Sequence, residues 1–389
     1  MGRRVVVVGA GIAGLATAVG LQRRGCEVTV VEARTDTSTG AGISIWPNAL
    51  AALDCIGLGD AVREAGGRIT AGALRWQDGS WLRRPAAERF VKALGEPLAV
   101  VQRSALRDIL TDALPAGTVE YELAVSGLVS TADGVRARLS DATVRIADAV
   151  IGADGTHSVV ARHLNGPLTD RYAGYTAWRG IAGYAMDSEL AGETFGPSAE
   201  TGHVPMGANL TYWFTTERAP EGSRSPQGEL PYLQAKLADW AEPIPSILAA
   251  TAAADVLRDD LYDRTPAQHW ARGPVVLVGD AAHPMRPHLG QGGCQALEDA
   301  AILAAFVDQT FDLTTAFARF AAFRRPRIKS LVRESALIGK VVHLRSAFFS
   351  AAATRATVLI PEALLTWHMA SVAARSAFTL PAGGGTGGR

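Results

Sequence analysis

Near its start the 389-residue chain carries VVVVGAGIAGL, from Val5 to Leu15, and far along it carries VVLVGDAAHPMRPHLGQGGCQALEDA, from Val275 to Ala300. Each stretch reads as a hydrophobic strand, a tight turn and the start of a helix. The N-terminus of a helix presents free N–H groups and the positive end of the helix dipole, which together favour a phosphate group. Two such turns in one chain predict a single large cofactor with two phosphates, held at both ends.

The first stretch has the glycine spacing of a dinucleotide-binding turn. Gly9, Gly11 and Gly14 give G-x-G-x-x-G, so the turn is tight, its backbone can approach a pyrophosphate, and the helix packs closely on the strand. The next strand ends at Glu32, where a carboxylate can meet ribose hydroxyls, and Arg34 follows to cover the adenosine. The cofactor contacts expected from this unit are Gly9, Gly11, Ala13, Gly14, Glu32 and Arg34.

Three more motifs follow: VQRSAL at 101–106, AVIGADGTHS at 149–158 and GDAAHP at 279–284. With the glycine turn, and in this order, they make the chain resemble the FAD-dependent class A flavoprotein monooxygenases, the family of p-hydroxybenzoate and salicylate hydroxylases. The resemblance spans roughly residues 3 to 330. It implies an α/β fold, in which a Rossmann-like FAD-binding domain of the glutathione-reductase type carries an inserted, mainly antiparallel substrate sheet and C-terminal helices.

The same resemblance assigns roles to individual residues. Arg103 would contact the cofactor, Asp154 would take part in FAD and NAD(P)H contact, and Asp280 would bind the ribityl or ribose hydroxyls of the flavin. The segment from Pro287 to Gly293 would lie along the isoalloxazine ring, and N–H groups at the following helix start could stabilise negative charge on it. The cofactor contacts expected from these motifs are Arg103, Asp154, Gly279, Asp280, Gly290, Gln291, Gly292 and Gly293.

One position departs from the family pattern. The D-G motif usually carries an arginine seven residues after its aspartate, whereas this chain has Ala161 there and Arg162 one place later. One residue corresponds to about 100° of rotation on a helix, so we expect Arg162 to face elsewhere. A direct role of that arginine in handling NAD(P)H is therefore left open.

The resemblance implies an FAD-dependent monooxygenase that uses NADPH or NADH and O2. Oxygen would be transferred from a C4a-hydroperoxyflavin to an aromatic or polycyclic small molecule. Epoxidation and Baeyer–Villiger ring insertion use the same intermediate and stay open, as does an FAD oxidase or dehydrogenase. A halogenase is disfavoured because its W-x-W-x-I-P segment is missing from the similar stretch at 240–245. A flavin-binding interaction protein is disfavoured because the aromatic-rich insert indicates a ligand chamber.

The candidate catalytic residues are Tyr212, His288 and Pro287. Tyr212 lies on an expected strand of the insert, and the urate-hydroxylase-like relatives that RYAGYTAWRG (171–180) resembles have a tyrosine at a matching place. His288 and Pro287 would lie near the flavin edge, although a loop histidine is more often bonded to backbone than catalytic. The expected lining of the substrate chamber is Trp46, Trp178, Arg179, Tyr212 and Trp213.

The strand and helix patterns predict a cofactor domain that is discontinuous in sequence. It would comprise residues 1–72, 98–165 and 268–335, with a substrate domain at 73–97 and 166–267, C-terminal helices at 336–381 and a disordered tail at 382–389. An Asp-Gly step at 78–79 predicts a hairpin. Helices are expected from about Gln295 through Ile338, with a break at Pro326.

Composition limits the possible partners. The chain is 48% apolar and 20% charged, which argues against disorder, and its net charge of zero provides no general attraction for nucleic acid or an anionic membrane. The first valine run is too short for a signal peptide, and polar residues interrupt the apolar C-terminal part. We therefore expect a cytoplasmic monomer or homodimer with no stable membrane association.

The three cysteines have neither metal-ligand nor disulfide spacing. Cys26, Cys55 and Cys294 are expected to pack as small hydrophobic residues, and no metal is expected. Cys294 lies near a helix start, where the pKa of a thiol can fall.

Overall fold

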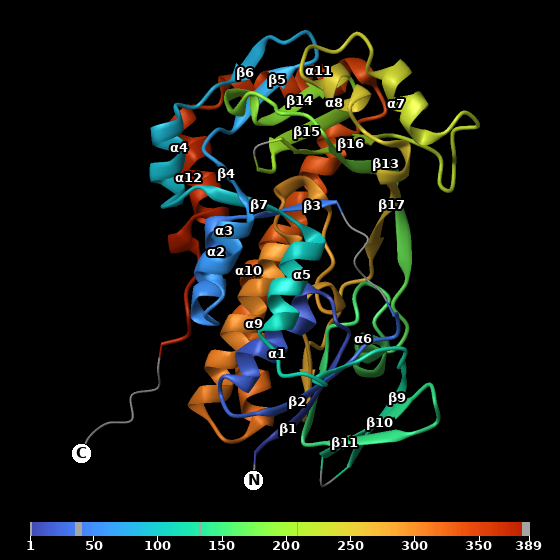
Figure 1. The fold of residues 1–389 in the computed structure, drawn as a ribbon, viewed down its shortest axis with the longest axis vertical. Coiled ribbons are helices and arrows are strands. Elements are labelled where there is room, and N and C mark those ends of the chain that lie inside the picture. The colour runs from blue at the N-terminus through green and yellow to red at the C-terminus, as the bar shows by residue number, and fades with distance from the viewer. Residues whose placement is uncertain (1, 36–40, 132–133, 208, 383–389) are drawn as a thin grey trace.

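A six-stranded sheet brings the two glycine turns together (Figure 1). The fold comes from a computed structural model that describes residues 2–35, 41–131, 134–207 and 209–382. The strand order is β18-β19-β12-β1-β2-β8, and every pair except β18–β19 is parallel. Both turns therefore lie at the same edge, where parallel strands end. The strands are β1 (Arg4–Val8), β2 (Glu27–Val31), β8 (Val119–Glu120), β12 (Ala149–Gly152), β18 (Ala271–Arg272) and β19 (Val275–Leu277).

The valine run of β1 is hydrophobic throughout because this sheet is covered on both faces. Val5 and Val7 pack with α1 (Ile12–Gln22) and α9 (Gly292–Gln309). Val6 and Val8 pack on the other face, with a three-stranded sheet of β9 (Val125–Thr131), β10 (Gly134–Leu139) and β11 (Val144–Ala147) and with α6 (Val159–Asn165).

A seven-stranded sheet forms the opposite end of the molecule (Figure 1). It is antiparallel except for one parallel pair, β5–β14, so the expected mainly antiparallel insert is confirmed. The hairpin at 78–79 is confirmed as the β5–β6 connection. In spatial order the strands are β17 (Leu257–Arg264), β13 (Asp170–Ala182), β16 (Thr211–Glu217), β15 (Ala199–Pro205), β14 (Gly192–Gly196), β5 (Ala73–Trp76) and β6 (Trp81–Arg83).

A small sheet and further helices complete the fold. The small sheet has the order β3-β7-β4. Helix α9 packs against α1, α2 and α10. The small-sheet strands are β3 (Gly42–Ile45), β4 (Gly67–Ile69) and β7 (Leu98–Gln102), and the remaining helices are α2 (Pro47–Cys55), α3 (Gly59–Ala65), α4 (Ala87–Leu94), α5 (Arg103–Asp112), α7 (Glu229–Lys236), α8 (Ile244–Ala249), α10 (Leu313–Val342), α11 (Ala347–Ala356) and α12 (Glu362–Ala373).

The expected helix break at Pro326 was wrong. Helix α10 continues through Pro326, and the chain instead breaks between α9 and α10. A proline inside a helix costs about 3 kcal/mol because it removes one hydrogen bond and crowds the preceding turn. Arg324, two residues earlier, is fully buried and pairs with Glu298 (2.6 Å) and Asp299 (2.7 Å) of α9. This packing of α10 on α9 outweighs the local preference of the proline.

The cysteines are free, and two of them are buried. Burial raises the pKa of the Cys294 thiol to about 12. The start of α9 therefore does not activate this thiol.

Within the described ranges, no single helix is long and apolar enough to cross a membrane, although the bent pair Ala347–Leu359 and Glu362–Ala373 together passes that test of length and composition. The expected disordered tail lies, from residue 383 onward, outside the described residues.

Candidate active site

A cleft of about 970 Å³ is lined by both glycine turns and by one face of the seven-stranded sheet. This volume is at the upper end of the range of about 300–1,000 Å³ for small-molecule and cofactor sites. Most of the residues expected at the site line this one cleft. They are Gly9, Gly11, Ala13, Glu32, Arg34, Arg103, Asp154, Tyr212, Asp280, Pro287, Gly290, Gly292 and Gly293. The expected site residues outside this lining are Gly14, Gly279, His288 and Gln291.

The three glycines of the first turn have different physical roles. Gly9 has a φ of +102°, and a Cβ there would lie 2.6 Å from the carbonyl oxygen of Ala153. A Cβ on Gly14 would lie 1.9 Å from the carbonyl oxygen of Gly9, so helix α1 can approach its strand only at a glycine. A Cβ on Gly11 would meet nothing within 4 Å and would project into open space. The Gly11 backbone is thus left accessible to a bound group.

Two carboxylates face the cleft from the ends of parallel strands. Glu32 accepts hydrogen bonds from the backbone N–H groups of Ala10 (2.8 Å) and Arg34 (2.9 Å), which hold it beside the first turn. Asp280 follows β19 and is exposed. Two carboxylates in one cleft suit the hydroxyl groups of a dinucleotide.

The second turn is held from behind by a buried polar network that the sequence analysis missed. Gly279 has a φ of +57° and packs against Ala13, so the two turns touch. Asp299 accepts hydrogen bonds from the Gly279 N–H (2.9 Å) and from Arg324 (2.7 Å), and lies 2.7 Å from Nε2 of His283. Burial alone would raise the pKa of Asp299, but His283 and Arg324 lower it on balance.

Gln291 belongs to the same network. Its amide is fully buried and accepts hydrogen bonds from Asn48 and Gln295, both at 2.9 Å. Gln291 therefore supports the loop from within, while Gly290, Gly292 and Gly293 face the cleft.

One face of the seven-stranded sheet forms the far wall of the cleft. Ala177 and Arg179 of β13 alternate with residues that point away, and they pair in register with Thr216 and Phe214 of β16. Tyr212 continues this face and packs against Gly42, where a Cβ would lie 2.6 Å from the tyrosine ring. Phe214 was missed, although its position two residues after Tyr212 on a strand could have identified it.

Three tryptophans expected in the chamber lie elsewhere, so this expectation was wrong. Trp178 and Trp213 point to the opposite face of the sheet, where they pack with α7 and α8. Their indole N–H groups donate to Glu229 (2.7 Å) and Thr251 (3.0 Å). Trp46 packs between two hydrophobic cores and is outside the cleft lining. Side chains alternate between the two faces of a strand, and this explains the positions of Trp178 and Trp213. Trp178 is next to Arg179 and Trp213 is next to Tyr212, so each tryptophan takes the face opposite to its cleft-lining neighbour.

The D-G motif is organised around Asp154, which lines the cleft. Its carboxylate accepts hydrogen bonds from the Ser158 hydroxyl and from the Val159 N–H (2.7 Å) at the start of α6. Burial raises the pKa of this carboxyl. Arg162 is outside the cleft lining and donates to the carbonyl oxygen of His157 (2.7 Å).

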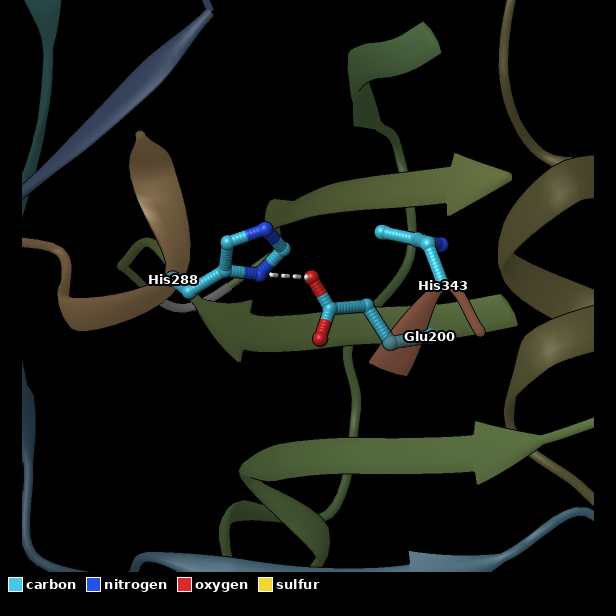
Figure 2. A group of neighbouring side chains, drawn as sticks. All are labelled: Glu200, His288 and His343. Atoms are coloured by element: carbon cyan, nitrogen blue, oxygen red, sulfur yellow. Dashed lines mark ion pairs between the residues drawn. The ribbon is translucent and has the colours of Figure 1, made fainter. Parts of the chain in front are cut away.

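His288 lies behind the cleft wall, in a buried group with Glu200 and His343 (Figure 2). Its Nδ1 is 2.7 Å from Oε1 of Glu200, and its Nε2 is 2.8 Å from the Tyr175 hydroxyl. Burial would raise the pKa of Glu200, but His288 lowers it on balance, and burial lowers the pKa of His343 to about 4. Pro287, the neighbour of His288, does line the cleft.

Two histidines and a glutamate can also bind a metal ion, but this geometry does not favour one. The ligand atoms lie within 4.8 Å of one another. In a tetrahedral zinc site with bonds of about 2.0 Å, neighbouring ligand atoms are about 3.3 Å apart. The 2.7 Å contact between His288 and Glu200 is shorter and corresponds to a direct contact between the two side chains. The absence of a metal remains a prediction.

Comparisons with known proteins identify the family. Residues 3–307 match the family described as FAD binding domain. The aurachin C monooxygenase/isomerase of Stigmatella aurantiaca is 35% identical over 89% of this chain and 91% of its own length. The 3-amino-4-hydroxybenzoate 2-monooxygenase of Streptomyces cremeus is 35% identical over 88% of each chain.

A solved structure supports the same assignment. HpxO of Klebsiella pneumoniae, complexed with FAD and uric acid, superimposes with a TM-score of 0.87 at 28% identity and covers 95% of this chain and 96% of its own. The two glycine turns, the carboxylates at the strand ends and the cleft fit FAD, which is the cofactor of this family. The chain belongs to the FAD-dependent class A flavoprotein monooxygenases.

Proposed function

We propose that this enzyme uses NADPH or NADH and O2 to hydroxylate an aromatic or polycyclic small molecule. The observation that carries the proposal is the shared cleft, in which the turns that fit FAD and the sheet face with Tyr212 and Phe214 line one cavity. A ring substrate on that sheet face would share the cavity with the flavin. Such proximity removes much of the entropic barrier to a reaction between two bound groups.

The cofactor roles proposed for individual residues follow from their positions. The N–H groups of the first turn and of the α1 start would bind the pyrophosphate, with Gly11 allowing its close approach. Glu32 and Asp280 would bind hydroxyl groups of the cofactor, and the backbone at Gly292 and Gly293 would face the ring. When bound, the flavin supplies the activation of O2 and the transfer of one oxygen atom.

The chain's own residues would orient the substrate and exclude water. Tyr212 and Phe214 offer aromatic surface for a ring, and the Tyr212 hydroxyl can hold a phenolic group. Burial raises the pKa of Tyr212, while the nearby Arg179 and Arg103 oppose this shift, so the hydroxyl stays protonated at neutral pH. Tyr212 would therefore position the substrate as a neutral hydrogen-bonding group.

The expected domain limits fit this arrangement and are part of the proposal. Residues 1–72, 98–165 and 268–335 would form the FAD-binding domain, and residues 73–97 and 166–267 would form the substrate domain. The seven strands of the second sheet all come from 73–83 and 170–264. We further propose a cytoplasmic monomer or homodimer without a metal.

Turnover of a ring substrate tests the function directly. Holoenzyme is screened with phenols, indoles and polyketide-like polycycles for substrate-stimulated oxidation of NADPH and NADH, and products formed under labelled dioxygen are analysed by mass spectrometry. Hydroxylation predicts one labelled oxygen on the ring. An epoxide or a ring-inserted lactone would identify one of the other oxygenations, and product without label would identify an oxidase or dehydrogenase.

A further inference from the structure

The loop of residues 286–290 connects the two halves of the cleft. Arg286, Pro287 and Gly290 line the cleft on the flavin side. The side chain of His288 points the other way, is fully buried, and reaches the seven-stranded sheet (Figure 2). The same short segment thus faces the cofactor with one side and the substrate sheet with the other.

Two strands of the substrate sheet hold His288. Glu200 of β15 pairs with its Nδ1 at 2.7 Å, and the Tyr175 hydroxyl of β13 contacts its Nε2 at 2.8 Å. Both partners are almost completely buried. Glu200 also accepts a hydrogen bond from the Thr216 hydroxyl (3.0 Å), and Thr216 belongs to the cleft wall. A chain of contacts therefore leads from His288 through Glu200 to Thr216, in the wall that would hold the substrate.

Helix α10 holds the loop from a third side. The Ser335 hydroxyl donates to the Arg286 carbonyl oxygen (2.6 Å). A Cβ on Gly339 would lie 2.6 Å from Nε2 of His288, so α10 can pack this closely only at a glycine. Arg286 itself makes two hydrogen bonds, of 2.8 and 2.6 Å, to Asp263 of β17.

We infer that His288 is a positioning residue that, held by Glu200 and Tyr175, fixes the flavin-side loop against the substrate sheet and thereby sets the gap between flavin and substrate. The inference rests on the proposed function and replaces the expected catalytic role of His288 with an indirect one. A buried polar contact is suited to this task because removing one partner leaves the other group unsatisfied. A small displacement of this loop would matter, since misplacing two reacting groups by about 1 Å can lower the rate of their reaction roughly 100-fold.

Tyr175→Phe tests the inference with the smallest change. It removes the hydroxyl that contacts His288 but keeps the ring, which stacks on His343 at 4.1 Å. Tyr172→Phe, on the same strand, is the matched control, because its hydroxyl donates to the Ala219 carbonyl oxygen (2.7 Å) away from the loop. Gly339→Ala is a second variant that displaces His288 without removing any of its partners.

Two measurements on each holoenzyme give the result. They are the visible circular dichroism of the bound flavin and the yield of hydroxylated product per NAD(P)H oxidised. We expect both variants to change the flavin dichroism and to lower the product yield. For Tyr175→Phe the yield should fall roughly 2- to 10-fold, the range for a lost hydrogen bond. Tyr172→Phe should leave both unchanged.

Unchanged dichroism and yield in both test variants would overturn the inference, as would equal losses in Tyr172→Phe. Elemental analysis that finds one equivalent of a divalent metal per chain, lost in Glu200→Gln, would also overturn it in favour of a metal site. If no ring compound is hydroxylated, the proposed function fails by itself, and the flavin dichroism still decides whether Tyr175 and Gly339 control the loop.

Discussion

Alanine at Gly14 should lower the stability of the protein, whereas alanine at Gly11 should leave stability unchanged and weaken cofactor binding. The Gly14→Ala methyl would lie 1.9 Å from the Gly9 carbonyl oxygen. Carbon and oxygen approach to about 3.3 Å at closest, so helix α1 would have to retreat by roughly 1.4 Å. Overpacking of a core typically costs 1–3 kcal/mol, and we expect about 3 kcal/mol here because the clash is with rigid backbone.

The assay is thermal unfolding of the FAD-free protein, together with FAD titration followed by flavin fluorescence. An unfolding entropy of about 2.1 cal/mol/K per residue gives roughly 0.8 kcal/mol/K for 389 residues, so Gly14→Ala should lower Tm by roughly 4 °C. Gly11→Ala should leave Tm unchanged, since its methyl meets no protein atom within 4 Å. It should weaken FAD binding roughly 5- to 150-fold, because the methyl occupies the path of the cofactor. A stable Gly14→Ala protein, or a Gly11→Ala protein with normal FAD affinity, would refute this reasoning.

Three further predictions concern the cofactor, the substrate and pH. Asp280→Ala and Glu32→Ala should each weaken FAD retention roughly 10- to 150-fold, because each removes a charge-assisted hydrogen bond of about 1.5–3 kcal/mol; full flavin occupancy of both variants after dialysis would show that the assigned roles are wrong. Tyr212→Phe should raise KM for a phenolic substrate while FAD binding stays normal, and unchanged kinetics would remove the proposed role of the hydroxyl. Burial lowers the pKa of His203 from 6.5 to about 4. Below pH 6.5 the unfolded chain therefore binds a proton that the folded protein does not, and stability is lost as the pH falls toward 4, by about 3 kcal/mol. Urea unfolding of wild type and His203→Gln at several pH values checks this, and the prediction fails if both lose stability in parallel.

The sequence predicted correctly those parts of the fold that are determined by residues close to one another in the chain. The glycine turns, the strand before each turn and the Asp-Gly hairpin all rest on contacts within a few residues. The expected cofactor contacts beyond the first turn came from the family resemblance, and most of them line the same cleft.

Most of the failures occurred where distant segments meet. Pro326 predicted a break, but the buried Arg324 and its partners on α9 hold the helix together. The tryptophan error was a local one: Trp178 and Trp213 directly neighbour Arg179 and Tyr212, so alternation along each strand already places them on the opposite face. The group around His288 was missed because Glu200 and His343 lie on other elements and no spacing connects them.

The strand order of the six-stranded sheet has a consequence for biosynthesis. The neighbouring strands β1, β12 and β19 come from residues 4–8, 149–152 and 275–277. At about 5–20 residues per second, the ribosome delivers β12 roughly 7–29 s after β1, and until then one edge of β1 lacks its partner strand. During that time the nascent chain exposes a hydrophobic strand edge, which is prone to pair with other chains. In a heterologous host, a lower growth temperature or added chaperones should therefore raise the yield of active enzyme more than added riboflavin does.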